Sequence, residues 1–143
     1  LDKIRSFDID PTCWQIAESI NKPWVMKDWQ FKSTTQDIHK INFNEYTFTT
    51  LRSNGTEREL HEVPNTIINT SCEHIENWDK WWNSIPNGKL CILQSNDYEE
   101  LSEHINCVKN IDHFKSIAPM KNYLYEGNLN LGKYIRYMII GIK

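Results

Sequence analysis

The spacing of apolar residues changes twice in the middle of the chain, and this change admits only folds that contain both strands and helices. Residues 41–52 are rich in Phe, Tyr and Thr, which favour a strand. Residues 70–84 then repeat Ile and Trp every three or four positions, which predicts a helix with its tryptophans in the core. Residues 90–93 form a short, continuously apolar run, which predicts a strand buried on both faces with Cys91 inside. We therefore expect an α+β or an α/β fold.

A hairpin is predicted around Asn54-Gly55, because both residues tolerate the positive φ that a type I′ turn requires. Residues 57–63 should return as an edge strand with charged side chains facing outward. Residues 134–142 predict a last, largely buried strand, whereas residues 111–125 look irregular.

Two helix starts are predicted from capping residues. Thr70 and Glu73 have the spacing of a capping box at the start of the tryptophan-rich helix. Asn96 and Asp97 offer N-caps for a second helix over residues 98–108. This interpretation of Asp97 needs no ligand.

Residues 1–40 give weaker signals. Residues 3–9 alternate loosely, as a strand does, and residues 25–31 show the period of two of a half-buried strand. Residues 13–20 predict a short helix whose apolar side chains face inward, namely Trp14, Ile16, Ala17 and Ile20.

The length of 143 residues predicts a single domain, with residues 1–40 as N-terminal strands and a short helix and residues 41–143 as the core. The formal net charge is −3 and its signs are scattered, so no basic stripe indicates a nucleic-acid partner. The longest apolar run, residues 138–140, is far below the roughly 18 residues of a spanning helix, and we expect no membrane insertion.

Sequons and cysteines favour a secreted or extracellular protein. Asn54 and Asn69 begin two glycosylation sequons. The four cysteines are an even number, which fits two disulfides in any of three pairings. The disulfide candidates are Cys13, Cys72, Cys91 and Cys107.

No metal, cofactor or catalytic motif is expected. The cysteines lack the tight pairs of a zinc site, and the five histidines form no ligand pattern. Cys107 and His113 could be imagined as a nucleophile and its base, but no motif marks an oxyanion hole. We therefore expect a protein that is not an enzyme.

Several short motifs, taken in order, resemble the ILEI/PANDER (GG) domain over residues 41–143. That family's pattern is an asparagine-glycine hairpin, a helix ending in Ile-Pro-x-Gly, an apolar strand, an acidic turn and a closing strand. The matching residues are Leu51–Thr56, Trp78–Gly88, Lys89–Leu93, Asp97, Gly132, Tyr137, Gly141 and Lys143.

The resemblance implies a compact, twisted antiparallel β-sandwich with two or three flanking helices. The family occurs in secreted cytokine-like proteins and in non-catalytic domains of glycan-processing enzymes. It also implies a ligand site that contains Asp97 and a residue shortly after Gly132. Tyr134 occupies that second position here, and Arg136 follows on the same face of the expected strand.

Three functions remain open on the sequence. We expect a non-enzymatic recognition domain, cytokine-like or glycan- or protein-binding, whose partner is a cell-surface protein or glycan. The alternative is a lipocalin-like β-barrel that carries a small hydrophobic ligand. A small hydrolase that uses Asp97 with a nearby Glu or His has the least support.

Overall fold

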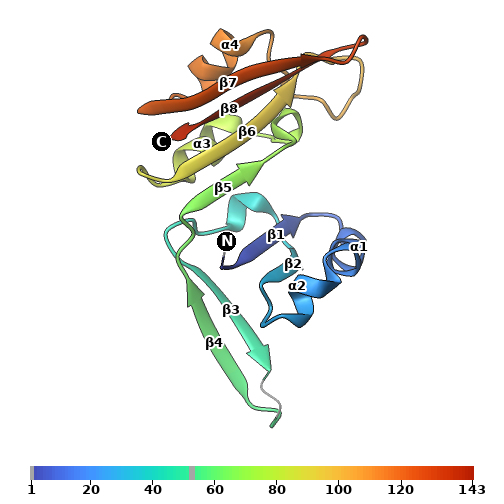
Figure 1. The fold of residues 1–143 in the computed structure, drawn as a ribbon, viewed down its shortest axis with the longest axis vertical. Coiled ribbons are helices and arrows are strands. Elements are labelled where there is room, and N and C mark those ends of the chain that lie inside the picture. Colours follow the sequence, from blue (N-terminus) through green and yellow to red (C-terminus); the bar gives the residue numbers. More distant parts are fainter. Residues whose placement is uncertain (1, 52–53) are drawn as a thin grey trace. The chain divides into compact units, whose positions relative to one another are not determined.

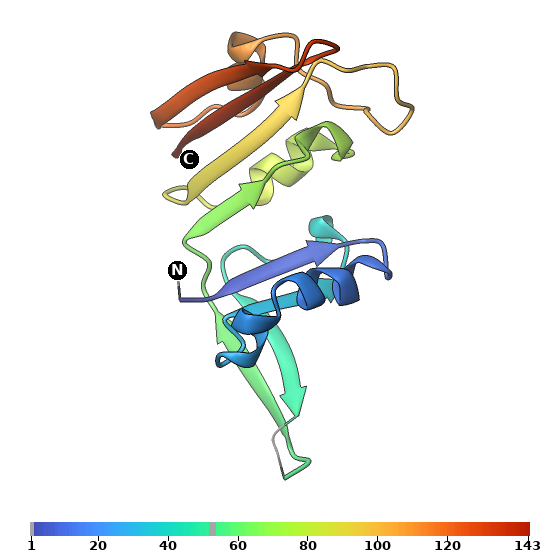
Figure 2. The same ribbon diagram turned by 45° about the vertical axis from the view of Figure 1, so that its right-hand side comes forward.

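The computed structural model describes residues 2–51 and 54–143, and the side chain of Leu51 lies outside this description. The chain divides into two compact units, Leu1–Ile41 and Asn42–Lys143. Figures 1 and 2 show the elements of each unit.

The first unit is a parallel strand pair joined by two short helices. Its elements are β1 (Ile4–Asp8), α1 (Cys13–Ile20), α2 (Lys22–Met26), β2 (Phe31–Thr35) and the 3₁₀ turn η1 (Ile38–Lys40). Ile4 of β1 lies opposite Phe31 of β2. The helices supply the crossover that a parallel connection needs.

The first unit confirms the helix over residues 13–20 but corrects two other expectations. The helix has no buried residue, and Ile16 and Ile20 are exposed rather than turned inward. The strand expected over residues 25–31 is wrong, because α2 extends to Met26 and residues 27–30 form a turn before β2. Pro23 at the start of α2 favours that helix, and positive φ angles at Asp28 and Trp29 then turn the chain into β2.

The second unit begins with the predicted hairpin. Strand β3 (Tyr46–Leu51) pairs antiparallel with β4 (Glu57–Glu62), and Gly55 has a φ of 78° between them. Of the turn residues, Arg52 and Ser53 lie outside the described residues. The strand starts later than residue 41, because Asn42 accepts a hydrogen bond from the amide of Asn44 and turns the chain there.

A mixed four-stranded sheet follows, in the order β5-β6-β8-β7. Its strands are β5 (Thr66–Asn69), β6 (Leu90–Asn96), β7 (Asn122–Asn130) and β8 (Ile135–Ile142). Strand β5 runs parallel to β6, whereas the other two pairs are antiparallel. The family resemblance implied an antiparallel arrangement, but this sheet is mixed.

One face of this sheet is buried beneath the helices α3 (Trp78–Ser84) and α4 (Ile111–Ile117), both behind the sheet in Figure 1. The indole nitrogen of Trp78 donates a 2.6 Å hydrogen bond to the carbonyl of Ile117, which ties the two helices together. The fully buried apolar side chains include Cys72, Trp81, Cys91, Leu93, Phe114 and Ile139. The predicted tryptophan core and the burial of Cys91 are confirmed.

The opposite face carries an apolar row that crosses all four strands. Ile68, Ile92, Ile140 and Tyr125 are successive partners in the register, and we call them the outer row. Ile68 is 57% exposed and Tyr125 is 51% exposed, while the two central isoleucines are half-buried. The expectation that residues 90–93 are buried on both faces is therefore wrong for the outer face.

Three expected segments differ from the structure. The helix begins at Trp78 rather than Thr70, since β5 and the 3₁₀ turn η2 (Cys72–His74) occupy the chain before it. Residues 98–108 contain no helix, because the backbone amides of Asn106 and Val108 donate to the distant carbonyls of Glu73 and Asn96 instead of to helical partners. Residues 111–125, expected to be irregular, hold α4 and the start of β7.

The α+β class is confirmed. No barrel closes among the described strands, which form sheets of two, two and four strands. The lipocalin-like alternative therefore lacks the barrel that would enclose its ligand. Among the described helices, none has the length and apolar character needed to cross a membrane.

Candidate functional site

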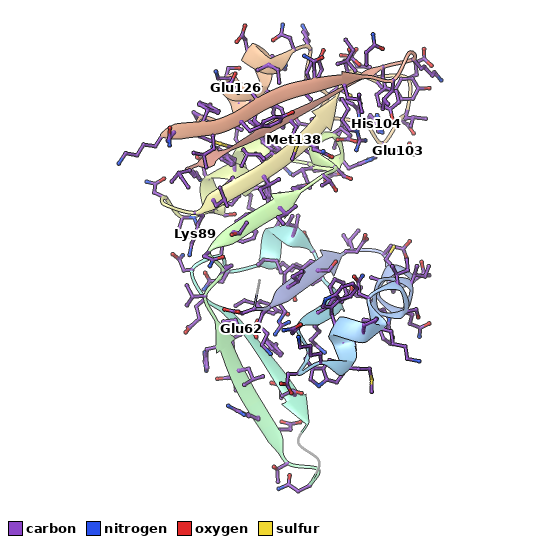
Figure 3. The ribbon with its side chains drawn as sticks, viewed as in Figure 1. Glu62, Lys89, Glu103, His104, Glu126 and Met138 are labelled. Carbon is purple, nitrogen blue, oxygen red and sulfur yellow. The ribbon has the colours of Figure 1, made fainter. Side chains whose placement is uncertain are left out.

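The candidate site lies where β6 ends and β8 begins. The turn η2 and the loop of residues 97–110 meet there, and Figure 3 shows Glu103 and His104 at this end of the sheet. Asp97, Tyr134 and Arg136, the ligand-binding residues implied by the family resemblance, all belong to this end. We call it the β6–β8 end.

Asp97 joins the loop to the first residues of β8. Its Oδ1 accepts a 2.8 Å hydrogen bond from the amide of Ile135, and the hydroxyl of Tyr137 lies 3.5 Å from its Oδ2. Burial, followed by the charge of Asp97, raises the pKa of the Tyr137 phenol. The predicted N-cap role of Asp97 is wrong, since its carboxylate is used in this long-range contact and no helix follows it.

Arg136 faces a buried carboxylate. Glu73 is only 2% exposed, and its Oε1 lies 3.6 Å from the Arg136 guanidinium and accepts a 2.7 Å hydrogen bond from Asn96. Arg136 also lies 3.5 Å from the carbonyl of Thr70. The second carboxylate oxygen of Glu73, Oε2, is buried and has no hydrogen-bond partner among the described residues.

An aromatic pair forms the surface of this end. The rings of Tyr98 and Tyr134 stack with centroids 5.6 Å apart. Lys133 lies over the Tyr98 ring at 4.3 Å, bonds to its hydroxyl, and is 3.4 Å from Glu100. The Tyr98 hydroxyl and Lys133 lower the pKa of the Glu100 carboxyl, and the pKa of Lys133 is raised in turn.

Two histidines lie beside Glu73. The rings of His74 and His104 meet edge to face with centroids 4.7 Å apart. Each Nδ1 faces a backbone carbonyl: His74 that of Glu103 at 3.0 Å, and His104 that of Tyr98 at 2.6 Å. One ligand atom each from Glu73, His74 and His104 lie within 4.8 Å of one another.

No spacing pattern in the sequence indicates this trio. His74 directly follows Glu73, but His104 is 30 positions further on and belongs to a loop. The only local sign of a metal site in the sequence is the adjacent pair Glu73-His74, and such a pair is too common to indicate a site by itself. Folding, not spacing, brings the third residue to it.

The cysteines are free thiols in the structure, so the expected two disulfides are absent from it. Cys72 and Cys91 are buried and behave as small apolar core side chains. Burial raises the pKa of both thiols, that of Cys91 to about 11. The pKa of Cys107 is likewise raised to about 11, by burial and then by the charges of Glu99, Glu73 and Asp97. Cys107 therefore stays protonated, which argues against a thiolate nucleophile there.

The two sequons differ in accessibility. Asn54 is exposed at the tip of the β3–β4 hairpin, where its side chain accepts hydrogen bonds from the amide and hydroxyl of Thr56. Asn69 is half-buried at the end of β5, and its side chain accepts a hydrogen bond from the amide of Ser71. The hairpin tip is therefore the better acceptor site.

A surface hollow lies at the opposite end of β8, and a lysine lines it. Its volume is about 740 Å³, and Trp82 and Lys143 are among its lining residues. The Lys143 ammonium donates hydrogen bonds to the carbonyls of Trp82 and Ile85, and it lies 4.6 Å from the Trp82 ring centroid. Lys143 thus caps the last turn of α3.

A scan against protein-family models and a search of curated proteins found no match for this chain.

Proposed function

We propose that the chain is a non-enzymatic recognition domain, secreted or extracellular, that binds a cell-surface glycan at the β6–β8 end. The observation that carries this proposal is the stacked pair Tyr98 and Tyr134. The C–H face of a sugar ring packs well on an aromatic ring, and tyrosine adds a hydroxyl for hydrogen bonding.

Charged groups beside the tyrosines suit a polyhydroxylated ligand. Lys133 offers hydrogen-bond donors and Glu100 offers acceptors, and both are exposed. Asp97 holds the amide of Ile135, the residue next to Tyr134, and thereby fixes the backbone that presents this ring. Asp97 is a positioning residue in this proposal, whereas the family resemblance made it a sugar contact.

The test is binding of the whole chain to a glycan array, followed by NMR titration with the glycans that bind. Tyr134→Ala should abolish binding, because it removes half of the aromatic pair. Tyr125→Ala is the matched control, since Tyr125 is an exposed tyrosine of β7 outside this cluster. Absence of glycan binding by the wild type, or equal loss in the two variants, would refute the proposal.

The outer row favours a second candidate, a protein partner bound to the face of the four-stranded sheet. Soluble proteins rarely leave a contiguous apolar sheet face uncovered unless it makes contacts. Saturable binding of the labelled chain to cells should then be lost in Ile68→Lys. Val63→Lys, which changes an exposed apolar residue that follows β4, should bind normally. Unchanged binding by Ile68→Lys would exclude this candidate.

A further inference from the structure

We propose that Glu73, His74 and His104 bind one divalent zinc ion at the β6–β8 end. Glu73 and His74 come from η2, and His104 comes from the loop that follows β6. The proposal does not rest on glycan binding.

The backbone carbonyls beside the histidines determine which ring nitrogen can bind a metal. A carbonyl oxygen only accepts hydrogen bonds, so Nδ1 of His74 and Nδ1 of His104 must each carry the proton. The lone pair of each neutral ring is then on Nε2. Metal-binding histidines are usually oriented in this way, by a hydrogen bond from the other ring nitrogen to a carbonyl or carboxylate.

Glu73 supplies an independent indication of a missing partner. Its side chain is almost fully buried, and Oε1 is satisfied by Asn96 and the nearby Arg136. Oε2 is left without a hydrogen-bond partner among the described residues. A buried carboxylate oxygen without a partner is costly, and a cation would remove that cost.

A structural ion pair alone does not account for this arrangement. The Arg136–Glu73 separation of 3.6 Å is longer than a hydrogen bond, and the guanidinium approaches Oε1 rather than Oε2. Arg136 balances one negative charge, so it lowers the affinity of the site for a cation without occupying the free oxygen. The exposed edge of His74 leaves a path by which an ion can enter.

The ligand set favours zinc over magnesium and calcium. Two imidazoles and one carboxylate suit zinc, whereas magnesium and calcium prefer oxygen ligands alone. In a tetrahedral zinc site with bonds of about 2.0–2.1 Å, ligand atoms are about 3.3 Å apart. One ligand atom of each residue lies within 4.8 Å of the others, so the ligand atoms must approach one another by up to about 4.8 − 3.3 = 1.5 Å to bind the ion. A fourth position stays open for water or a ligand oxygen.

Zinc would join η2 to the loop of residues 97–110, which has no helix or strand of its own. The carbonyl of Tyr98 already holds His104, so the metal would also restrain the loop that presents the tyrosine pair. Zinc should consequently raise the thermal stability of the chain, since a ligand that binds only the native state stabilises it.

The experiment is calorimetric titration of the full, tag-free and metal-free chain with zinc chloride. One zinc ion should bind per chain, and His74→Ala and His104→Ala should each weaken binding by at least about tenfold. Glu73→Gln should also weaken it, because its amide can still accept the bond from Asn96 but cannot ligate zinc through nitrogen. His74 is exposed, so His74→Ala remains informative if Glu73→Gln fails to fold.

Two matched controls separate this site from adventitious binding. His61 of the hairpin lies 3.5 Å from Glu45 and 3.2 Å from Glu59, so it tests whether any histidine beside carboxylates binds zinc. His113 belongs to no group of three metal-binding side chains among the described residues. His61→Ala and His113→Ala should bind zinc as the wild type does, and so should Tyr134→Ala. No zinc binding by the wild type, full affinity in His74→Ala, or loss of binding in His61→Ala would overturn the proposal.

Discussion

Of the glycines, only Gly141 of β8 would bring an added Cβ against the backbone of a neighbouring strand, and adding one methyl group there should destabilise the protein. A Cβ built on Gly141 would lie 2.3 Å from the carbonyl oxygen of Asn122 and 2.6 Å from the sulfur of Met120. Real Cβ contacts stay above 3.0 Å, so the carbonyl would have to withdraw by at least 3.0 − 2.3 = 0.7 Å. That carbonyl belongs to β7, which pairs with β8 and cannot withdraw without disturbing the ladder.

The expected net cost of Gly141→Ala is about 1–2 kcal/mol. Overpacking a core site costs about 1–3 kcal/mol, and replacing Gly by Ala in a strand returns about 0.5–1 kcal/mol. Gly127→Ala is the matched control on the neighbouring strand. The three atoms nearest to its Cβ would all belong to the side chain of Tyr125, which is half exposed and can rotate away.

Urea unfolding, followed by the fluorescence of the buried tryptophans, measures both variants. A loss of about 1–2 kcal/mol should lower the midpoint by roughly 0.5–1 M for a slope near 2 kcal/mol/M. Gly127→Ala should stay within about 0.5 kcal/mol of the wild type. A Gly141→Ala variant as stable as the wild type, or equal losses in both, would refute the reasoning.

Three further outcomes follow from the packing. Burial raises the pKa of Cys91 from 9.0 to about 11 in the folded state. The stability that this shift contributes, up to about 2 kcal/mol, is therefore present below pH 9 and is lost as the pH rises toward 11. In urea unfolding at increasing alkaline pH, Cys91→Ala should lose less stability than the wild type does. Lys143→Met should cost about 1 kcal/mol in urea unfolding, because two carbonyls at the end of α3 lose a charged donor. In a secretory host, mass analysis should find a glycan on Asn54 before Asn69; occupancy at Asn69 alone would contradict the exposure difference.

Residue spacing and turn residues predicted the helix and the hairpin, which are formed by residues close together in the sequence. The helix at residues 78–84 is found where tryptophans recur at helical spacing, and the hairpin is found where Asn54-Gly55 predicted it. The same rules failed at Thr70, where capping-box spacing suggested an earlier helix start. There Glu73 is instead used by Asn96, a residue 23 positions away, and that contact outweighs a local cap.

Long-range contacts also explain what was missed at the candidate site. Asp97 follows a strand in a way that suggests an N-cap, yet its carboxylate bonds to Ile135, 38 positions away. The pairing of His104 with Glu73 and His74 depends on the path of a loop without regular structure. No periodicity encodes such a path, so only the folded chain reveals the cluster.

The most direct test of the candidate site is the NMR measurement of imidazole nitrogen shifts in the metal-free protein at neutral pH. The structure predicts that His74 and His104 each carry a proton on Nδ1, and that one equivalent of zinc shifts their Nε2 resonances and not those of His61. Protons on Nε2 in both rings, or a zinc response confined to His61, would contradict the arrangement of the β6–β8 end.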